Sequence, residues 1–242
     1  TGCGDCPDLK SFLRIDWDTT RASVRAKRRV FQNVRLTVVS PSQWLADVVR
    51  ASPLLAHVQV KRIPYGVDSS LYAPRPKAEA RRMFGLAPDA SVIATIAHDF
   101  RDRRKGAVYF ERAVLELPRR YDGATLLCIG RGDPGAALRE RFNVVKTGFI
   151  SDPCMLVAAY SAADLLALSS LADNLPNVVL ESLACATPVV SFEVGGVPDL
   201  VRHLENGYLA PLRDHRALTQ GIDRLLSDRD ECQAMGDAGR RR

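Results

Sequence analysis

Short apolar runs rich in β-branched residues alternate with amphipathic segments along most of the chain. The runs predict strands, and apolar residues spaced by about three or four positions in the segments between them predict helices. The expected strands are residues 35–40, 57–63, 91–97, 124–129, 143–146, 164–168 and 188–192. The expected helices are residues 43–51, 106–119, 134–141, 152–161, 176–184, 214–226 and 229–239. This alternation indicates βαβ units, and therefore an α/β fold with a parallel sheet.

A proline-bearing segment divides this pattern into two series. It begins at the turn Pro64-Tyr65-Gly66-Val67-Asp68 and continues through Pro74 and Pro76, so we expect a linker there. The predicted domains are residues 1–72, the end of a first domain with the linker, and residues 73–242, a second domain. Because the chain has no initial Met and stops in a helix-like stretch, we expect a piece of a longer protein.

Composition and charge exclude several classes of protein. With 46% hydrophobic and 26% charged residues, the chain is typical of globular proteins. No apolar run reaches the roughly 18 residues of a membrane span. The net charge is +6, but the basic residues are scattered, and residues 151–200 contain no Lys or Arg. Nucleic-acid binders cluster such charge on one face beside exposed aromatic residues, so we expect no nucleic-acid partner.

Cys3 and Cys6 have the spacing of half a zinc knuckle. A structural zinc site needs a full tetrahedral set of ligands, and no second pair follows in the sequence. The two cysteines are therefore either an orphan pair or half of a site whose other ligands lay upstream. Because no metal-binding acidic pair is evident, we expect no metal in the chemistry of this chain.

The segment 130–135 follows a predicted strand and matches the G-x-G-x-x-G pattern of dinucleotide-binding proteins. Such proteins carry an acidic residue about 20 positions further on, and Asp152 lies near that distance. Asp152 also has the sequence context of a helix cap, and Asp133 would bring a carboxylate to the pyrophosphate. We therefore favour a turn whose glycines, Gly130 and Gly132, let some ligand approach the backbone. An NAD-dependent oxidoreductase is the alternative.

Residues 173–181, Asp-Asn-Leu-Pro-Asn-Val-Val-Leu-Glu, predict the start of a helix. Pro176 suits the first helical position, with Asp173 or Asn174 as the cap. Unpaired amides at such a helix start are a ready site for a diphosphate. The amides concerned belong to Asn177 and Val178.

Glu181 lies one turn inside the same predicted helix, on the face of Asn177. One carboxylate before the helix and one within it suit a ligand with hydroxyls on both sides of a diphosphate. A capping aspartate and a solvated glutamate are the alternative interpretation of the same spacing.

Continued to Val190, this segment resembles the E-x7-E signature of glycosyltransferase family 4, whose members are retaining enzymes of the GT-B fold. Six further segments resemble family elements in the expected order: Pro64–Asp68, Arg104-Lys105-Gly106, Tyr160–Asp164, Gly195–Asp199, Glu205-Asn206-Gly207 and, for the colanic-acid and exopolysaccharide enzymes, Gly2–Pro7. The resemblance covers essentially the whole chain. It implies a Rossmann-like domain that binds a nucleotide sugar, residues 73–242, after a partial Rossmann-like domain on the acceptor side.

The resemblance also implies roles for single residues. Glu181 would accept hydrogen bonds from the ribose, and Asp173, helped by the backbone of Asn174 and Leu175, would hold the donor sugar. Cations and amides would bind the diphosphate, and glycines with a strand end would border the nucleotide. These residues are Lys105, Arg104, Arg101, Asn177, Val178, Gly130, Gly132 and Phe149, with Asp173, Lys105 and Arg104 as the catalytic set.

Two departures from the family pattern are visible. Asp173 replaces the usual first Glu and is shorter by one methylene. The Gly-Arg pair before the Lys-Gly element is absent, so Arg101, Arg103 or Arg104 would substitute for its arginine, and the sequence leaves open which.

The implied function is retaining transfer of a hexose from a nucleotide-diphosphate donor to a glycan or lipid-linked acceptor in polysaccharide biosynthesis. No cofactor beyond the donor is implied. We expect a cytoplasmic location, with a peripheral contact at the inner face of the plasma membrane and self-association through an uncovered apolar face as further expectations. A binding module without catalysis is the alternative within the same resemblance. The base, sugar, acceptor and linkage are not predicted.

Overall fold

The computed structural model describes Gly4, Leu9 and residues 16–242. Contacts between residues divide the chain into two compact units, Thr1–Pro64 and Tyr65–Arg242. The division falls at the start of the segment that the sequence predicts as a linker. Cys3 and Cys6 lie outside the described residues, so half of a zinc site and an orphan pair both stay open as predictions.

The first unit is small. Its elements are α1 (Thr20–Phe31), β1 (Thr37–Ser40), α2 (Gln43–Ala51) and β2 (Gln59–Arg62). The two strands are parallel, with Thr37 opposite Gln59. The hydroxyl of Ser42 accepts a hydrogen bond from the Leu45 amide at 3.1 Å and so caps α2. Helix α1 was not predicted and contributes no buried residue.

The second unit is built on a six-stranded sheet with the order β5-β4-β3-β6-β7-β8, in which all neighbouring strands are parallel. Its strands are β3 (Val92–Asp99), β4 (Thr125–Arg131), β5 (Asn143–Gly148), β6 (Leu165–Leu168), β7 (Val189–Phe192) and β8 (Gly207–Ala210). This confirms the predicted α/β fold with a parallel sheet. The strand order reverses direction between β3 and β6, and ligands of such sheets bind at the carboxyl ends of strands at this switch point.

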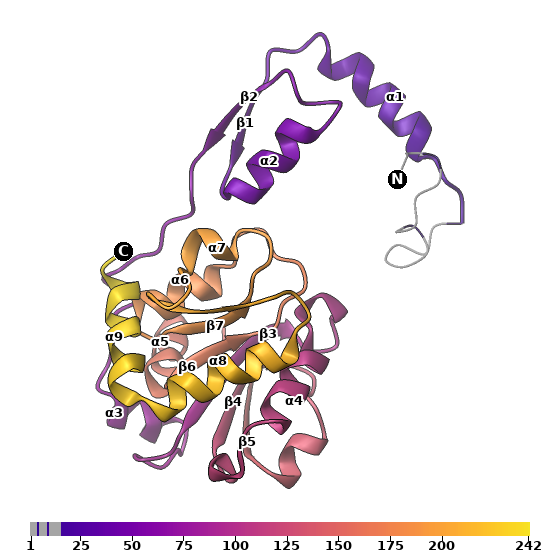
Figure 1. Ribbon diagram of the computed structural model, residues 1–242. Coiled ribbons are helices and arrows are strands. Elements are labelled where there is room, and N and C mark those ends of the chain that lie inside the picture. The colour runs from indigo at the N-terminus through magenta and orange to yellow at the C-terminus, as the bar shows by residue number, and fades with distance from the viewer. Residues whose placement is uncertain (1–3, 5–8, 10–15) are drawn as a thin grey trace. The chain divides into compact units, whose positions relative to one another are not determined.

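Helices cover both faces of this sheet (Figure 1). They are α3 (Lys77–Met83), α4 (Ala107–Leu115), α5 (Pro153–Ala162), α6 (Asn177–Ala184), α7 (Val197–Leu200), α8 (His215–Ser227) and α9 (Arg229–Arg240), together with the short 3-10 helices η2 (Arg103–Lys105), η3 (Arg119–Tyr121) and η4 (Ala137–Glu140). None of the helices among residues 16–242 combines the length and the apolar character that crossing a bilayer requires.

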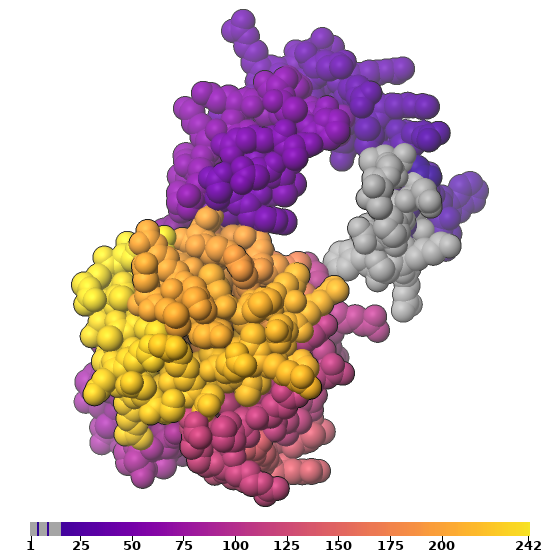
Figure 2. All heavy atoms as spheres, in the orientation of Figure 1, coloured from indigo at the N-terminus to yellow at the C-terminus, as the bar shows by residue number. Residues whose placement is uncertain are grey.

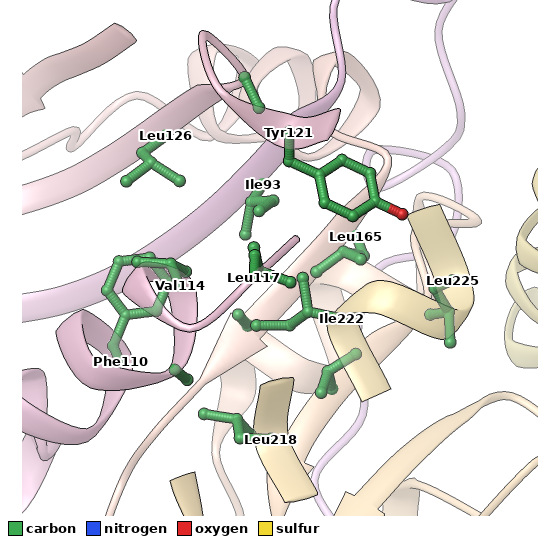
Figure 3. Close-up of a cluster of buried hydrophobic side chains, with 14 of the residues drawn as sticks. Ile93, Phe110, Val114, Leu117, Tyr121, Leu126, Leu165, Leu218, Ile222 and Leu225 are labelled. Atoms are coloured by element: carbon green, nitrogen blue, oxygen red, sulfur yellow. The ribbon is translucent and has the colours of Figure 1, made fainter. Parts of the chain in front are cut away.

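Alternate residues of the strands enter two separate cores. On β4, Leu126 and Cys128 pack with α4 and α8, whereas Leu127 and Ile129 pack with the helices of the other face. Figure 3 shows the first core, where Phe110 and Val114 of α4 and Leu218, Ile222 and Leu225 of α8 meet Ile93, Leu126 and Leu165 of the sheet. Side chains of a strand alternate between faces, so burial of both faces explains the continuous apolar runs in the sequence.

The second core lies between the sheet and α3, α5, α6 and α7. Its largest buried side chain is Tyr160 of α5, which is 0% exposed. In the view of Figure 2, the yellow spheres of the C-terminal helices pack against the magenta spheres of the α4 region, on the side of the first core. The sheet is therefore buried on both sides, and its strand ends are the places where polar residues can gather.

Several elements differ from their predictions. The predicted helix 106–119 ends at Leu115 because Pro118, which lacks an amide proton, starts a separate 3-10 turn. Strand β8 was not predicted, and Glu205-Asn206-Gly207 before it was matched only to a family element. Helix α3 was not predicted; it follows directly on the proline-bearing segment, and Pro76 forms its N-cap. The four-residue helix α7 was also missed.

Candidate functional site

Two loops meet at the switch point of the sheet. One follows β3 and contains η2, and the other follows β6. The amide of Leu171 donates to the carbonyl oxygen of Arg104 at 2.7 Å, and the hydroxyl of Ser169 donates to that of Lys105 at 3.0 Å. The backbone of the Arg104-Lys105-Gly106 element is therefore fixed on the loop of the neighbouring strand.

Two glycines allow the loops around this crevice to pack closely. Gly106 has a φ of +63°, and a Cβ there would lie 2.1 Å from the carbonyl oxygen of Ser169. Gly195 has a φ of +54°, and a Cβ there would lie 1.7 Å from the carbonyl oxygen of Asp173. Only glycine fits either position, because both the left-handed conformation and the contact exclude a side chain.

Lys105 and Asp173 form an ion pair in this crevice. The Lys105 Nζ lies 2.8 Å from Asp173 Oδ2, and the side chains are 27% and 19% exposed. The structure thus brings together two of the three residues predicted to be catalytic, although 68 positions separate them. The predicted capping role of Asp173 is wrong, because its carboxylate binds Lys105 and no side chain caps α6.

The arginines of the loop after β3 are bound to neighbouring aspartates. Arg101 binds Asp99 at 2.6 Å and holds the pKa of that carboxyl down to about 2. Arg104 binds Asp102 at 2.8 Å, and Asp173 lies near enough to add to the rise in the pKa of Arg104. Arg103 is exposed, and among residues 16–242 no carboxylate pairs with it. Any of these three arginines can therefore be the one that substitutes for the arginine of the family pattern.

Helix α6 starts at Asn177, one residue later than predicted, because Pro176 is its N-cap and not its first residue. The Val179 amide donates to the Pro176 carbonyl oxygen at 3.0 Å. For the amides of Asn177 and Val178, no acceptor exists in the described part of the chain. The two amides predicted to bind an anion are thus available at the start of the helix.

Glu181 is half-buried one turn further along α6. The hydroxyl of Tyr160 donates to its Oε2 at 2.8 Å, and Tyr72 lines the same pocket as the carboxylate. Burial raises the pKa of Glu181, and the Tyr160 hydrogen bond and the nearby Tyr72 hydroxyl oppose that rise. A pocket of about 150 Å³ adjoins the carboxylate, lined by Gly66, Val67, Asp68, Tyr72, Asn177, Leu180 and Glu181. Glu181 is therefore not the solvated surface residue of the alternative interpretation.

The remaining predicted residues around α6 are the backbone groups of Asn174 and Leu175. Both precede Pro176 in the loop after β6, where the Leu175 side chain is 4% exposed and belongs to the second core. The Asn174 side chain is half-buried. Burial of Leu175 fixes the loop between Asp173 and the start of α6.

The glycine-rich segment after β4 is shaped by packing of the chain on itself. A Cβ on Gly130 would lie 1.7 Å from the carbonyl oxygen of Ala97 in β3, and one on Gly132 would lie 3.0 Å from Asp99 Oδ1. A 3-10 turn, η4, follows the segment. No full helix therefore presents its N-terminus to a pyrophosphate, as a dinucleotide fingerprint requires.

The two acidic residues considered for that fingerprint have structural roles. Asp133 binds Arg139 at 2.6 Å and accepts a hydrogen bond from the Gly135 amide. Asp152 accepts one from the Cys154 amide at 2.9 Å and is the N-cap of α5, which confirms the predicted cap. Both carboxylates therefore stabilise the local fold of this chain.

Phe149 follows β5 at the same edge of the sheet, and its side chain is exposed. Its ring meets that of His98 with the centroids 5.3 Å apart, and the Arg131 guanidinium lies 5.7 Å from its centroid. Three neighbouring strands, β3, β4 and β5, thus contribute one exposed aromatic and cationic cluster beside the switch point.

This arrangement agrees with a known protein family. The sequence profile of "Glycosyl transferases group 1" matches residues 90–228, which include the sheet from β3 to β8 and both loops of the crevice. The chain belongs to the glycosyl transferases group 1 family. The family resemblance drawn from the sequence is thereby confirmed, whereas the narrower likeness to colanic-acid enzymes stays a prediction.

Relatives within the glycosyl transferases group 1 family include enzymes of inositol glycosides. The chain is 32% identical over 187 residues to a D-inositol 3-phosphate glycosyltransferase of Segniliparus rotundus, covering 73% of this chain and 41% of that protein. It is 30% identical over 194 residues to a GDP-mannose-dependent alpha-(1-6)-phosphatidylinositol monomannoside mannosyltransferase of Mycobacterium tuberculosis, covering 74% and 49%. The chain thus spans about half the length of these relatives.

Solved structures of glycosyltransferases share the fold. A sucrose-phosphate synthase from Thermosynechococcus elongatus superposes with a TM-score of 0.77 at 26% identity, covering 98% of this chain and 60% of that one. Anabaena HepE, in complex with UDP and glucose, superposes with a TM-score of 0.72 at 22% identity, covering 91% and 60%. These matches confirm the predicted GT-B fold class.

The sequence did not reveal every residue that shapes the site. Tyr160 was noted only as part of a motif, and Tyr72 was not noted, although Tyr160 binds Glu181 and Tyr72 lines the same pocket. Ser169 and the tight contacts of Gly106 and Gly195 were likewise missed. The sequence motifs that contain Tyr160 and Gly195 could have indicated these contacts. A polar or small residue inside an apolar segment needs a hydrogen-bond partner or a close backbone contact.

Proposed function

We propose that the chain is the donor-binding half of a retaining glycosyltransferase, which transfers a hexose from a nucleotide-diphosphate sugar to a glycan or lipid-linked acceptor. The observation that carries this proposal is the Lys105–Asp173 pair at the switch point, beside the two available amides of α6. Cations and amides suit a diphosphate, and carboxylates suit the hydroxyls of a sugar and a ribose.

Each residue then has a defined task. Glu181 accepts hydrogen bonds from the ribose hydroxyls, and the amides of Asn177 and Val178 bind the diphosphate. Asp173 accepts hydrogen bonds from hydroxyls of the donor sugar, and Phe149 borders the base. The backbone of Asn174 and Leu175 supports the sugar, whereas Gly130 and Gly132 keep the strand ends close enough for the nucleotide to reach the sheet.

Transfer would break the bond between the anomeric carbon of the sugar and the diphosphate oxygen. Negative charge then grows on the leaving phosphate, and Lys105 lies where it can stabilise that charge. A lysine ammonium has three protons to donate, so Lys105 can bind phosphate without releasing Asp173. Arg104, or Arg101 or Arg103 from the same loop, adds a second cation. The new bond forms to a hydroxyl oxygen of the acceptor on the same face of the sugar, and the proton of that hydroxyl passes to the leaving diphosphate.

The relatives support the substrate class of this proposal. A protein named as GDP-mannose-dependent and a structure containing UDP both match most of this chain. The same proposal extends to the whole protein. It includes the acceptor side, a role in polysaccharide assembly and a location at the cytoplasmic side of the membrane. A binding module without catalysis is the second candidate, because the chain spans about half of the relatives.

Calorimetric titration with UDP, GDP, ADP and NAD tests the proposal. One nucleoside diphosphate should bind, and Glu181→Ala should weaken its binding by about 1–3 kcal/mol, as expected for a lost hydrogen bond to a charged group. Glu79→Ala, which removes an exposed carboxylate from α3, is the matched control. Binding of NAD alone, or of a diphosphate with no effect of Glu181→Ala, would refute it. Slow release of free sugar from the bound donor would distinguish an enzyme from a binding module.

A further inference from the structure

Tyr160 is the buried partner of Glu181. It lies in α5, is 0% exposed, and places its hydroxyl 2.8 Å from Glu181 Oε2. Burial and the charge of Glu181 raise the pKa of Tyr160 well above its ordinary value. The hydroxyl therefore stays protonated and donates a hydrogen bond to the carboxylate. A tyrosine hydroxyl inside an apolar helix has no role in packing, since phenylalanine would fill the same space.

Tyr72 approaches Glu181 from a different segment. It is half-buried, it lines the same pocket as Glu181, and its hydroxyl lowers the pKa of the carboxylate. Its backbone is fixed at both groups: the Tyr72 amide donates to the Asp68 carbonyl oxygen at 2.8 Å, and the Tyr72 carbonyl oxygen accepts from Arg240 at 3.0 Å. Arg240 also binds the carbonyl oxygens of Ser69 and Ala184, which joins this segment to the end of α6.

A glutamate side chain has three rotatable bonds, and a solvated one changes rotamer freely. The Tyr160 hydroxyl from α5, which donates to Glu181, and Tyr72 from the segment 65–72, which lies on the same pocket, restrict the Glu181 carboxylate to the wall of the 150 Å³ pocket. Gly66, Val67 and Asp68 line the same pocket, so the segment that holds Tyr72 also shapes the space before the carboxylate.

We propose that Tyr160 and Tyr72 are positioning residues, which hold the Glu181 carboxylate in the orientation that accepts hydrogen bonds from the ribose of the donor. This inference rests on the proposed function and adds two residues that act only through Glu181. Preorganised acceptors bind more tightly, because the cost of ordering the side chain is met during folding. The tyrosines therefore contribute to affinity for the nucleotide without touching it.

The test is calorimetric titration of the full chain with the nucleoside diphosphate that it binds, using Tyr160→Phe and Tyr72→Phe. Each variant should weaken binding by about tenfold. Tyr121→Phe is the control, because Tyr121 belongs to the first core and its hydroxyl binds Asp223 instead of Glu181. In the background of Glu181→Ala, the tyrosine substitutions should change the affinity by less than twofold, since the group through which they act is gone.

A pH series adds a result that a merely structural role would not produce. Loss of either hydroxyl removes a polar group that lowers the pKa of Glu181, so binding should fall off at a higher pH than in the unsubstituted chain. The other titratable groups near the carboxylate are Cys185, whose pKa burial raises to about 12, and Asp68 on the pocket wall. Neither changes its protonation between pH 5 and 8, because the pKa of Asp68 is lowered by its hydrogen bonds with Ser70.

The outcomes are distinct. Equal weakening by the tyrosine substitutions with and without Glu181 would overturn the inference and leave the proposed function intact. Unchanged nucleotide affinity in both Tyr160→Phe and Tyr72→Phe would also overturn the inference and leave the proposed function intact. If the unsubstituted chain binds no nucleoside diphosphate, the proposed function fails, and this inference fails with it. Should Tyr160→Phe not fold, the more exposed Tyr72→Phe decides the question.

Discussion

Replacing Gly106 by alanine tests whether the site depends on the close contact between the loops after β3 and β6. An alanine Cβ at Gly106 would lie 2.1 Å from the carbonyl oxygen of Ser169, and ordinary contacts begin at 3.4 Å. One of the loops must therefore move by 3.4 − 2.1 = 1.3 Å. Lys105 precedes this glycine, so its Nζ cannot keep both its place in the crevice and its 2.8 Å contact with Asp173.

The expected loss of stability has two parts. An alanine in the left-handed conformation costs about 1–2 kcal/mol, and forcing an atom into a packed contact costs about 1–3 kcal/mol more. Gly85→Ala is the matched control, because Gly85 has a similar φ of +65° and nothing lies within 4 Å of its Cβ position. Gly85→Ala should show only the first part. Displacement of a catalytic group by about 1 Å lowers transfer by about 10²-fold, so Gly106→Ala should also impair donor turnover.

Urea unfolding followed by circular dichroism measures the two stabilities, and hydrolysis of the donor measures turnover. The reasoning is refuted if Gly106→Ala and Gly85→Ala lose the same free energy of unfolding. It is also refuted if Gly106→Ala loses more stability but retains full turnover, because the loop contact would then be unrelated to the position of Lys105.

Three further substitutions probe other parts of the site. Lys105→Met should lower transfer by about 100-fold, whereas Lys77→Met, whose lysine pairs with Asp164 at the same 2.8 Å, should leave it unchanged; equal effects in the transfer assay would contradict the assigned role. Asp152→Ala should cost about 1 kcal/mol of unfolding free energy through loss of the α5 cap, and weaker nucleotide binding in calorimetry would instead favour a ribose contact. Glu181→Gln should stabilise the chain at pH 7, because burial raises the pKa of Glu181 in the folded state above its ordinary value of 4.5. The ionised carboxylate then favours the unfolded chain as the pH rises, so the gain should vanish below pH 4.5, and a gain independent of pH in thermal unfolding would contradict this.

Local patterns predicted most of the fold of residues 65–242, because both faces of the sheet are buried and its strands are continuous apolar runs. The pattern failed where tertiary contacts decide the conformation. Strand β8 pairs with β7, and a Cβ on Gly207 would lie 2.2 Å from the carbonyl oxygen of Val189. In the sequence, that glycine was matched only to a family element and predicted no strand. Pro76 likewise suggested a linker, although it begins helix α3.

The site was predictable as a set of residues but not as a set of contacts. The spacing of Asn177 and Glu181 on α6 follows from helix geometry, so their placement could be worked out from the sequence. The contact of Asp173 with Lys105 joins residues on two strands' loops, and no local rule reveals it. The capping prediction failed for this reason: Asp173 had a stronger partner elsewhere in the fold.

The order of the strands has a consequence for how the chain folds. Strand β3 pairs with β4, the next strand in sequence, and with β6, where Ile93 lies opposite Leu165. The second pairing closes a loop of 165 − 93 = 72 residues, and long-range parallel pairings of this kind form late and slowly. The crevice that holds Lys105 and Asp173 lies where β3 pairs with β6, so it exists only in molecules in which the two halves of the sheet have paired. A nucleotide would then bind the finished fold and not its precursors, and by mass action it would draw the chain toward completion.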